Sequence, residues 1–179
     1  MENKNIMMFS NNSNKKNEQP KVKINLSLFD KILEIVGLVL LISYWFIIIN
    51  SYSNLPDNVP THFNGAGQPD GYGSKLSIFG LPVIGLFAFV LLTIFNKYPE
   101  KFTYSVQITD DNAKTQYILA TRRNRIIKTI ILILFIIIDF RTIEIAVGDS
   151  ISLGSWFFLF VFCLFFIPVV FYVIKQNVD

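Results

Sequence analysis

Cysteine and histidine are almost absent from this chain, in which Cys163 and His62 are the single residues of their kinds. One cysteine excludes a disulfide framework, and no Cys/His spacing typical of a zinc site occurs. We interpret Cys163, which lies in an apolar run, as a small apolar side chain of a helix. The sequence therefore predicts no metal site and no cofactor.

Charge is also scarce. Charged residues make up 16% of the 179 residues, whereas a soluble domain usually carries about 25%. Hydrophobic residues reach 52%, and phenylalanine alone occurs 18 times. A domain of this size cannot bury so much apolar surface in its own core, so we expect the lipid bilayer to cover part of it.

We expect no signal peptide in residues 1–20, because they contain neither an apolar core nor a small-residue cleavage site. This segment is rich in Asn and Lys, and we interpret it as a disordered cytosolic tail. We expect residues 21–179 to form a single membrane domain.

Four apolar stretches are each long enough to cross a bilayer core about 30 Å thick, which takes about 20 helical residues. The predicted spans are residues 32–50, 76–95, 126–147 and 151–174. The fold class that we predict is an all-α membrane protein with about four transmembrane helices and an ordered extracellular loop between the first two.

Lys and Arg gather in alternate connecting segments, which predicts the orientation because cytosolic segments carry the excess of basic residues. The segment before the first span and residues 96–125 are basic, and Lys175 follows the last span. Residues 55–75 contain a single basic residue, Lys75, at their end. We therefore predict cytosolic N- and C-termini, an outer loop at residues 55–75 and a cytosolic loop at residues 96–125.

Two cytosolic segments, residues 21–26 and 104–108, alternate polar and apolar side chains. This alternation is typical of strands, and we expect a short two-stranded cytosolic β pairing. Thr109 is the expected N-cap of the helix that leads into the third span. We interpret the basic cluster at residues 122–125 as a headgroup anchor, and nothing in the sequence indicates a nucleic-acid partner.

Asp139, Arg141 and Glu144 interrupt the third span. Ionisable side chains inside a span are costly and deserve a functional hypothesis. Arg141 and Glu144 are three residues apart and are expected to pair on one face of the helix. Asp139 either meets another helix or the outer loop, or it responds to protons or a ligand beneath that loop.

The outer loop combines turn-forming and polar residues. Proline fixes φ, Pro69-Asp70-Gly71 is a turn signal, and we expect the loop to be ordered. For His62 we considered a metal site shared with nearby acids, acid–base catalysis, and a structural hydrogen bond. The loop residues that we name as candidate ligand contacts are Pro60, His62, Asn64, Gln68, Asp70, Tyr72 and Lys75.

Two blocks of this chain, residues 55–75 and 96–117, resemble a bacterial membrane domain of unknown function. The first block runs from Leu55-Pro56 through Val59-Pro60-Thr61-His62-Phe63-Asn64 to Gly67-Gln68-Pro69-Asp70-Gly71-Tyr72-Gly73-Ser74-Lys75. The same domain forms the N-terminal part of SdpI-type toxin immunity proteins. The resemblance implies a multi-pass protein of the bacterial plasma membrane, in toxin immunity or envelope sensing, and implies no catalytic residue.

Three functions fit these observations. A binding or sensing protein, contacting an extracellular peptide or toxin or another membrane protein, predicts an ordered outer loop packed on the span ends. A small ion-coupled transporter component predicts a polar cavity reaching Asp139 and Asn50. A membrane enzyme predicts that His62 and Asp70 converge on an open pocket. We rank the non-enzymatic binding function first.

Overall fold

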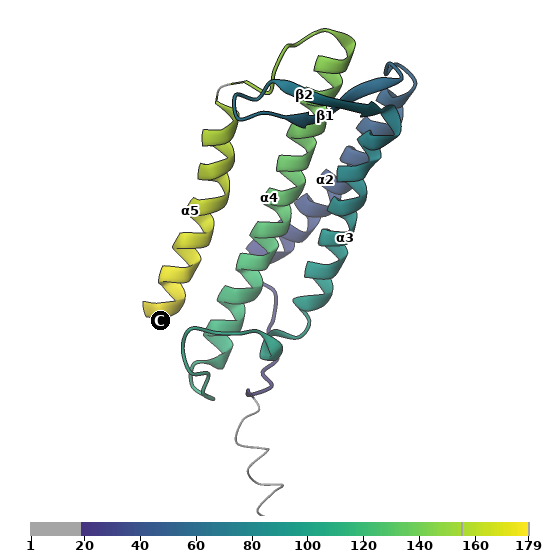
Figure 1. Cartoon of the computed structure of the whole chain (residues 1–179). Helices are drawn as coiled ribbons and strands as arrows, with labels where there is room; N and C mark the ends of the chain where they lie inside the picture. The colour runs from purple at the N-terminus through teal and green to yellow at the C-terminus, as the bar shows by residue number, and fades with distance from the viewer. Residues whose placement is uncertain (1–18, 155, 179) are drawn as a thin grey trace, which may run out of the picture.

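The computed structural model describes residues 19–154 and 156–178, and it contains four long helices and one small sheet. The helices lie side by side, and the two strands form a hairpin across one end of the bundle (Figure 1). We call this the hairpin end, and we call the other end, which holds residues 19–27 and 96–112, the basic end. In chain order the elements are α2 (Leu28–Tyr52), β1 (Asn58–Phe63), β2 (Pro69–Ser74), η1 (Lys75–Phe79), α3 (Gly80–Phe95), η2 (Pro99–Lys101), α4 (Ala113–Val147) and α5 (Phe157–Val178).

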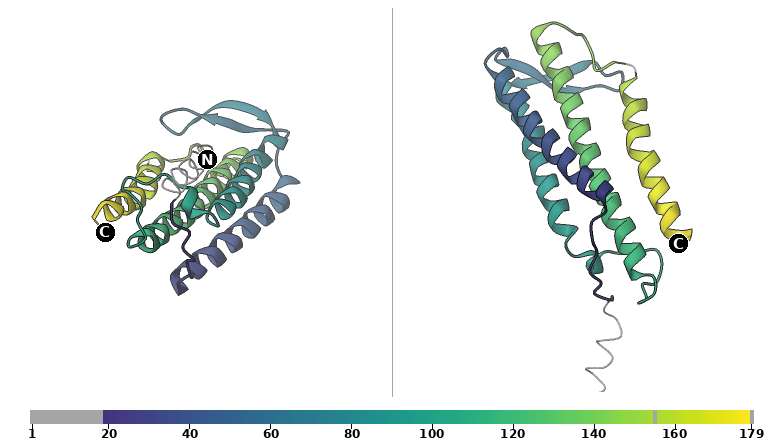
Figure 2. Two further views of the ribbon diagram at one scale, coloured as in Figure 1. Left: turned by 90° about the horizontal axis from the view of Figure 1, so that it is seen from below. Right: turned by 180° about the vertical axis from the view of Figure 1, so that it is seen from behind.

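Helix α4 lies at the centre and packs against α2, α3 and α5 (Figure 2). Its 35 residues extend over about 52 Å at 1.5 Å per residue. The neighbouring helices shield this helix, which explains how it carries polar groups that lipid would penalise. Its buried polar residues are Gln116, Thr121, Arg125, Lys128, Thr129, Asp139 and Thr142.

The other three helices are apolar nearly all round. Residues Leu28–Tyr52, Lys75–Phe95 and Phe157–Lys175 are each long and apolar enough to cross a membrane. Large side chains such as Phe46, Phe87 and Leu159 point away from the bundle and are exposed. A soluble protein rarely exposes this much apolar surface, so the fold is that of a membrane-type helical bundle. The predicted fold class, with four apolar helices, is confirmed.

Helix α2 begins with a capping box, in which Ser27 and Asp30 each accept a hydrogen bond from the backbone N–H of the other. Its buried residues follow the three- and four-residue spacing of one helical face, which packs on α4. They are Asp30, Gly37, Leu41, Tyr44 and Ile48.

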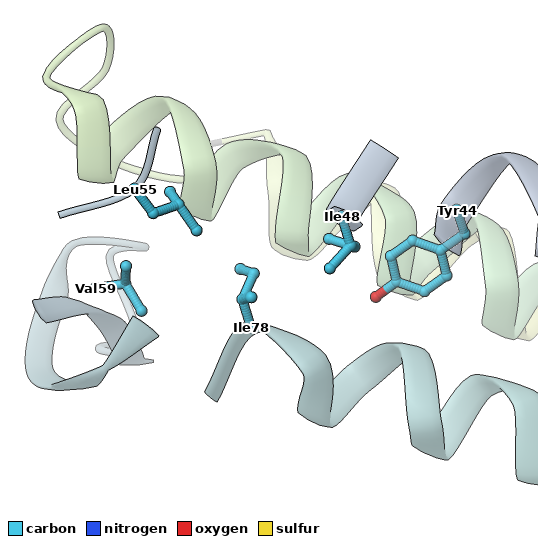
Figure 3. Close-up of a cluster of buried hydrophobic side chains, with 5 residues drawn as sticks. All are labelled: Tyr44, Ile48, Leu55, Val59 and Ile78. Carbon is cyan, nitrogen blue, oxygen red and sulfur yellow. The ribbon is translucent and has the colours of Figure 1, made fainter. Parts of the chain in front are cut away.

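An apolar cluster joins the hairpin to the helices. It comprises Tyr44 and Ile48 from α2, Leu55 from the segment before β1, Val59 from β1, and Ile78 from η1 (Figure 3). Val59 is completely buried, so β1 packs directly against the ends of the helices. The expected ordered structure between the first two helices is therefore present, as an antiparallel hairpin.

The sheet forms in a different place from the pairing that we expected. Residues 21–26 and 104–108 contain no strand, and the observed sheet pairs residues 58–63 with 69–74. Side chains hold the basic end together instead of a backbone ladder. Gln19 Nε2 donates to Phe102 O at 3.1 Å, and the Tyr117 hydroxyl donates to Pro20 O at 2.8 Å. Burial raises the pKa of Tyr117, which keeps this hydroxyl protonated as a donor.

Two predicted helix starts also differ from the structure. Helix α4 begins at Ala113 and not at Thr109, because Asn112 Oδ1 accepts the Thr109 N–H at 2.9 Å and closes a turn before it. Helix α5 begins at Phe157 and not at residue 151, since Ser152 O accepts a hydrogen bond from Arg141 at 2.6 Å. Most of the predicted tail, residues 1–18, lies outside the described residues.

Candidate functional site

The hairpin turn is organised by Asn64. Its side-chain oxygen accepts the backbone N–H groups of Ala66 and Gln68 at 2.9 and 3.1 Å, and its own carbonyl accepts the Gly67 N–H at 2.8 Å. Gly67 has a φ of 74°, which favours glycine. Its carbonyl accepts the Leu153 N–H at 2.8 Å, so the tip of the hairpin is tied to the link between α4 and α5.

His62 and Asp70 pair across the two strands. His62 Nδ1 lies 2.5 Å from Asp70 Oδ1, where the register of the ladder is irregular. The two side chains are 73% and 42% exposed, so the pair lies on the solvent side of the hairpin. Sequence reasoning placed both residues in one loop, and the structure brings them into direct contact.

The other candidate residues of the loop do not join this pair in one pocket. Lys75 Nζ forms an ion pair with Asp57 at 3.1 Å and lies 5.6 Å from the centre of the Tyr52 ring. Tyr72 is exposed, Gln68 belongs to the turn, and Pro60 is a buried residue of β1. No group of three or more His, Cys, Asp or Glu able to hold a metal occurs among the described residues.

A cavity of about 380 Å³ lies beneath β1, between α3 and α4. Pro60, Thr61 and Phe63 form its roof, and residues of η1, α3 and α4 form its walls. Asp139 is the one ionisable residue in its lining. The remaining wall residues are Ser77, Ile78, Gly80, Leu81, Ile84, Ile138 and Thr142.

Asp139 is 4% exposed and is held by a neighbouring helix. The Tyr44 hydroxyl donates to Asp139 Oδ2, and Phe135 O lies 3.3 Å from the same hydroxyl. Asp139 therefore meets another helix, as one of the two expectations stated. Asn50, by contrast, donates to Phe46 O on its own helix and does not line the cavity.

The predicted pairing of Arg141 with Glu144 is confirmed, at 2.6 Å between Arg141 Nη1 and Glu144 Oε2. Arg141 Nη2 also donates to Ser150 Oγ and Ser152 O, at 2.7 and 2.6 Å. The guanidinium thus fixes the link that follows α4. Arg141 and Glu144 therefore have their own hydrogen-bond partners, and neither residue lines the cavity beside Asp139.

Toward the basic end, α2 and α4 share a partly buried network of charges that we did not predict from the sequence. Asp30 accepts from Arg122 at 2.8 Å and lies 3.9 Å from Arg125. Glu34 accepts from Arg125 at 2.9 Å and from Lys128 at 2.5 Å. The hydrogen bond from Arg122 to Asp30 raises the pKa of Arg122. We call these five side chains the charge network.

The charge network corrects our interpretation of residues 122–125 as a headgroup anchor at two positions, Arg122 and Arg125. The Arg125 and Lys128 side chains are 6% and 0% exposed, so they point into the bundle. Lys128 Nζ also donates to Thr93 Oγ1 at 2.8 Å and lies 4.3 Å from the centre of the Phe89 ring. The signal in the sequence was Asp30 and Glu34, four residues apart and so on one face of α2.

The part of the chain that contains the hairpin is similar to a known protein family. The family model of a domain of unknown function, DUF1648, matches residues 38–86, which cover most of α2, the hairpin and the start of α3. An uncharacterised protein of Archaeoglobus fulgidus is 32% identical over 73 residues, which are 36% of this chain. The chain covers 40% of the length of that relative. No solved structure matches the chain. Residues 38–86 are therefore similar to DUF1648, a domain without an assigned activity.

Proposed function

We propose that this protein is a multi-pass binding protein of the bacterial plasma membrane, whose hairpin faces the outside and contacts a peptide or toxin. Envelope sensing and toxin immunity are the functions that such contact serves. The observation that carries the proposal is the attachment of the hairpin at both of its ends. Val59 is buried against the helices, and Gly67 O accepts the Leu153 N–H.

The distribution of basic residues supports the outward orientation. Apart from Lys75 and Arg141, no Lys or Arg occurs in residues 51–96 or 129–174. Lys75 pairs with Asp57, and Arg141 pairs with Glu144. Unpaired positive charge therefore gathers at the basic end, where Lys97, Lys101 and Lys114 are exposed. The positive-inside rule assigns such an end to the cytosol.

The solvent side of the hairpin suits recognition better than catalysis. The His62–Asp70 pair is exposed, and Tyr72 beside it is 62% exposed. A rigid backbone that presents an aromatic ring and a polar pair is a common contact surface for peptides. Neither His62 nor Asp70 lines the cavity, and this separation does not favour the enzyme hypothesis.

One observation favours a second candidate function. The cavity beneath β1 reaches Asp139, as a small ion-coupled transporter component requires. Its lining residues lie at the hairpin end of the bundle, and Asn50 is not among them. Recognition at the hairpin therefore remains the function that we favour.

Survival of cells exposed to secreted peptide toxins tests the proposal. A deletion strain is complemented with the wild-type protein, with H62A, with D70A or with Y72A, at equal membrane levels. Lys97→Ala at the basic end is the matched control. We expect wild type and K97A to protect and the hairpin variants to protect less. If all of the complemented strains survive equally, the hairpin does not bind the toxin, and if none differs from the deletion, the immunity form of the proposal is wrong.

A further inference from the structure

The cavity beneath β1 combines an apolar lining with one buried carboxyl group. Asp139 Oδ2 accepts from the Tyr44 hydroxyl, whereas Oδ1 accepts no hydrogen bond from any described residue. Oδ1 is accessible at the cavity surface. A ligand that donates a hydrogen bond to it therefore satisfies an acceptor that no described residue satisfies.

No positive group among residues 19–154 and 156–178 balances Asp139. Arg141 lies two positions along α4, about 200° around the helix, and its guanidinium is bound to Glu144 and to Ser150. Lys75 is bound to Asp57, and the roof and walls of the cavity contribute no Lys, Arg or His. Electrostatic complementarity therefore favours a cation or a strong hydrogen-bond donor at Oδ1.

Size and polarity define the rest of the ligand. A volume of about 380 Å³ is near the lower limit of small-molecule pockets. Phe63, Leu81 and Ile84 give the cavity an apolar contact surface. Apart from Asp139, its polar side chains are the hydroxyl groups of Thr61, Ser77 and Thr142. An acyl chain alone would fill the apolar part and leave Oδ1 unpaired, and a carboxylate or phosphate would be repelled by Asp139.

We propose that this cavity binds a small amphipathic ammonium ion, with its apolar chain between α3 and α4 and its protonated amine on Asp139. The site is distinct from the exposed His62–Asp70 surface, so it extends beyond recognition at the hairpin. Binding of an ammonium ion in the cavity is tested independently of toxin binding at the hairpin. An ammonium donates to Oδ1, Tyr44 keeps its bond to Oδ2, and the ligand supplies the positive charge that the protein lacks.

Three probes of equal chain length test the proposal on the purified full-length protein in a non-ionic detergent: hexylammonium, 1-hexanol and hexanoate. Trp45 is the reporter, because its ring stacks on Phe79 of η1 at 6.4 Å, next to the cavity residues Ile78 and Gly80. The Trp156→Phe background leaves Trp45 as the single tryptophan. Fluorescence and the thermal midpoint are recorded against probe concentration at neutral pH, where an alkylamine is protonated.

We expect saturable binding in which hexylammonium is favoured over hexanol by about tenfold, the usual value of one charge-assisted hydrogen bond. Asp139→Asn should reduce this preference to less than about twofold. Glu144→Gln, which removes a carboxylate already paired with Arg141, should leave the preference unchanged. Hexanoate should bind more weakly than either of the other probes.

A second variant keeps the test independent of Asp139. Gly80 lines the cavity, has helical φ and ψ, and a Cβ added there meets no atom within 4 Å. Gly80→Leu should therefore fold and weaken hexylammonium and hexanol together by narrowing the cavity. Equal binding of hexanol and hexylammonium to the wild type, an undiminished preference in D139N, or no saturable binding would each overturn the proposal.

Discussion

The two polar regions of α4 stabilise their buried ionisable side chains in different ways. In the charge network, five ionisable side chains from α2 and α4 balance one another through direct ion pairs. About 16 Å further along α4, at 1.5 Å per residue, Asp139 is just as buried but has only the neutral Tyr44 as its partner. A bundle in lipid tolerates both arrangements because α4 is covered by its neighbours.

The difference separates a structural feature from a candidate binding site. Side chains that already form ion pairs with one another have few free hydrogen-bonding groups for a ligand. Removing one partner of such a pair lowers the free energy of unfolding strongly. A lone carboxyl group beside a cavity has a free acceptor, and its replacement removes little from the fold. Effects on stability should therefore be large in the charge network and small at Asp139, while effects on ligand binding should follow the opposite order.

The largest effect on stability is expected for Glu34→Gln in the charge network. Glu34 is the shared acceptor of Arg125 and Lys128, so its neutralisation leaves two buried cations without that counterion. Removing one partner from a buried ion pair typically costs about 3–5 kcal/mol. The free energy of unfolding in mixed micelles measures this loss. Asp111→Asn, at an exposed carboxylate, is the control and should change it by less than about 0.5 kcal/mol.

Tyr44→Phe should have the next largest effect, at the hairpin end. The substitution keeps the ring in the apolar cluster but removes the one hydroxyl that donates to Asp139. Leaving a buried acceptor without its donor should lower the free energy of unfolding by about 1–3 kcal/mol. In the double variant with Asp139→Asn, the loss should be smaller than in Tyr44→Phe alone. A loss that simply adds up would mean that the two side chains do not interact.

Gly67→Ala should have a smaller effect, confined to the tip of the hairpin. The φ of 74° is unfavourable for alanine, and the added Cβ would lie 3.3 Å from Leu153 Cβ. We expect the free energy of unfolding to fall by about 1–2 kcal/mol. Hydrogen exchange should become faster than in the wild type in residues 58–74 and stay unchanged in α4. Gly65→Ala is the matched control, because a Cβ there meets nothing within 4 Å. Equal exchange in the two variants would show that the tip is not held against Leu153.

Asp139→Asn should have the smallest effect on stability. The asparagine side chain still accepts from Tyr44, and any buried charge that lacks a counterion is removed. We therefore expect the free energy of unfolding to stay within about 1 kcal/mol of the wild-type value. A loss as large as that of Glu34→Gln would place Asp139 in the same structural class as the charge network and would remove the contrast between the two regions.

The sequence predicts the helices better than the sheet. Long apolar runs locate α2, α3, α4 and α5, and three-residue spacing predicts the bond from Arg141 to Glu144. Alternation at residues 21–26 resembles a strand, yet this segment forms none. Strand β2, Pro69–Ser74, contains two glycines and a proline, which weaken any strand signal.

The candidate site was predictable only in part. Local signals predicted an ordered loop and singled out His62, Asp70 and Asp139, but they placed the turn at Pro69-Asp70-Gly71, which lies in β2, whereas the turn forms at Asn64. The contact of Tyr44 with Asp139 joins residues 95 positions apart, and the ion pair of Glu34 with Lys128 joins residues 94 apart. Such contacts depend on how α2 crosses α4, and no local pattern in the sequence contains that information.

The placement of the two ends on opposite sides of the membrane is tested most directly by cysteine labelling in intact cells. Cys163 is first replaced by serine, and one cysteine is then introduced either at Gly65, on the hairpin turn, or at Lys97, at the basic end. Both positions are exposed, and neither belongs to the charge network or the cavity. We predict that a membrane-impermeant maleimide labels Gly65→Cys in intact cells and Lys97→Cys only after permeabilisation. The reverse pattern, or equal labelling of both positions before permeabilisation, would contradict the account.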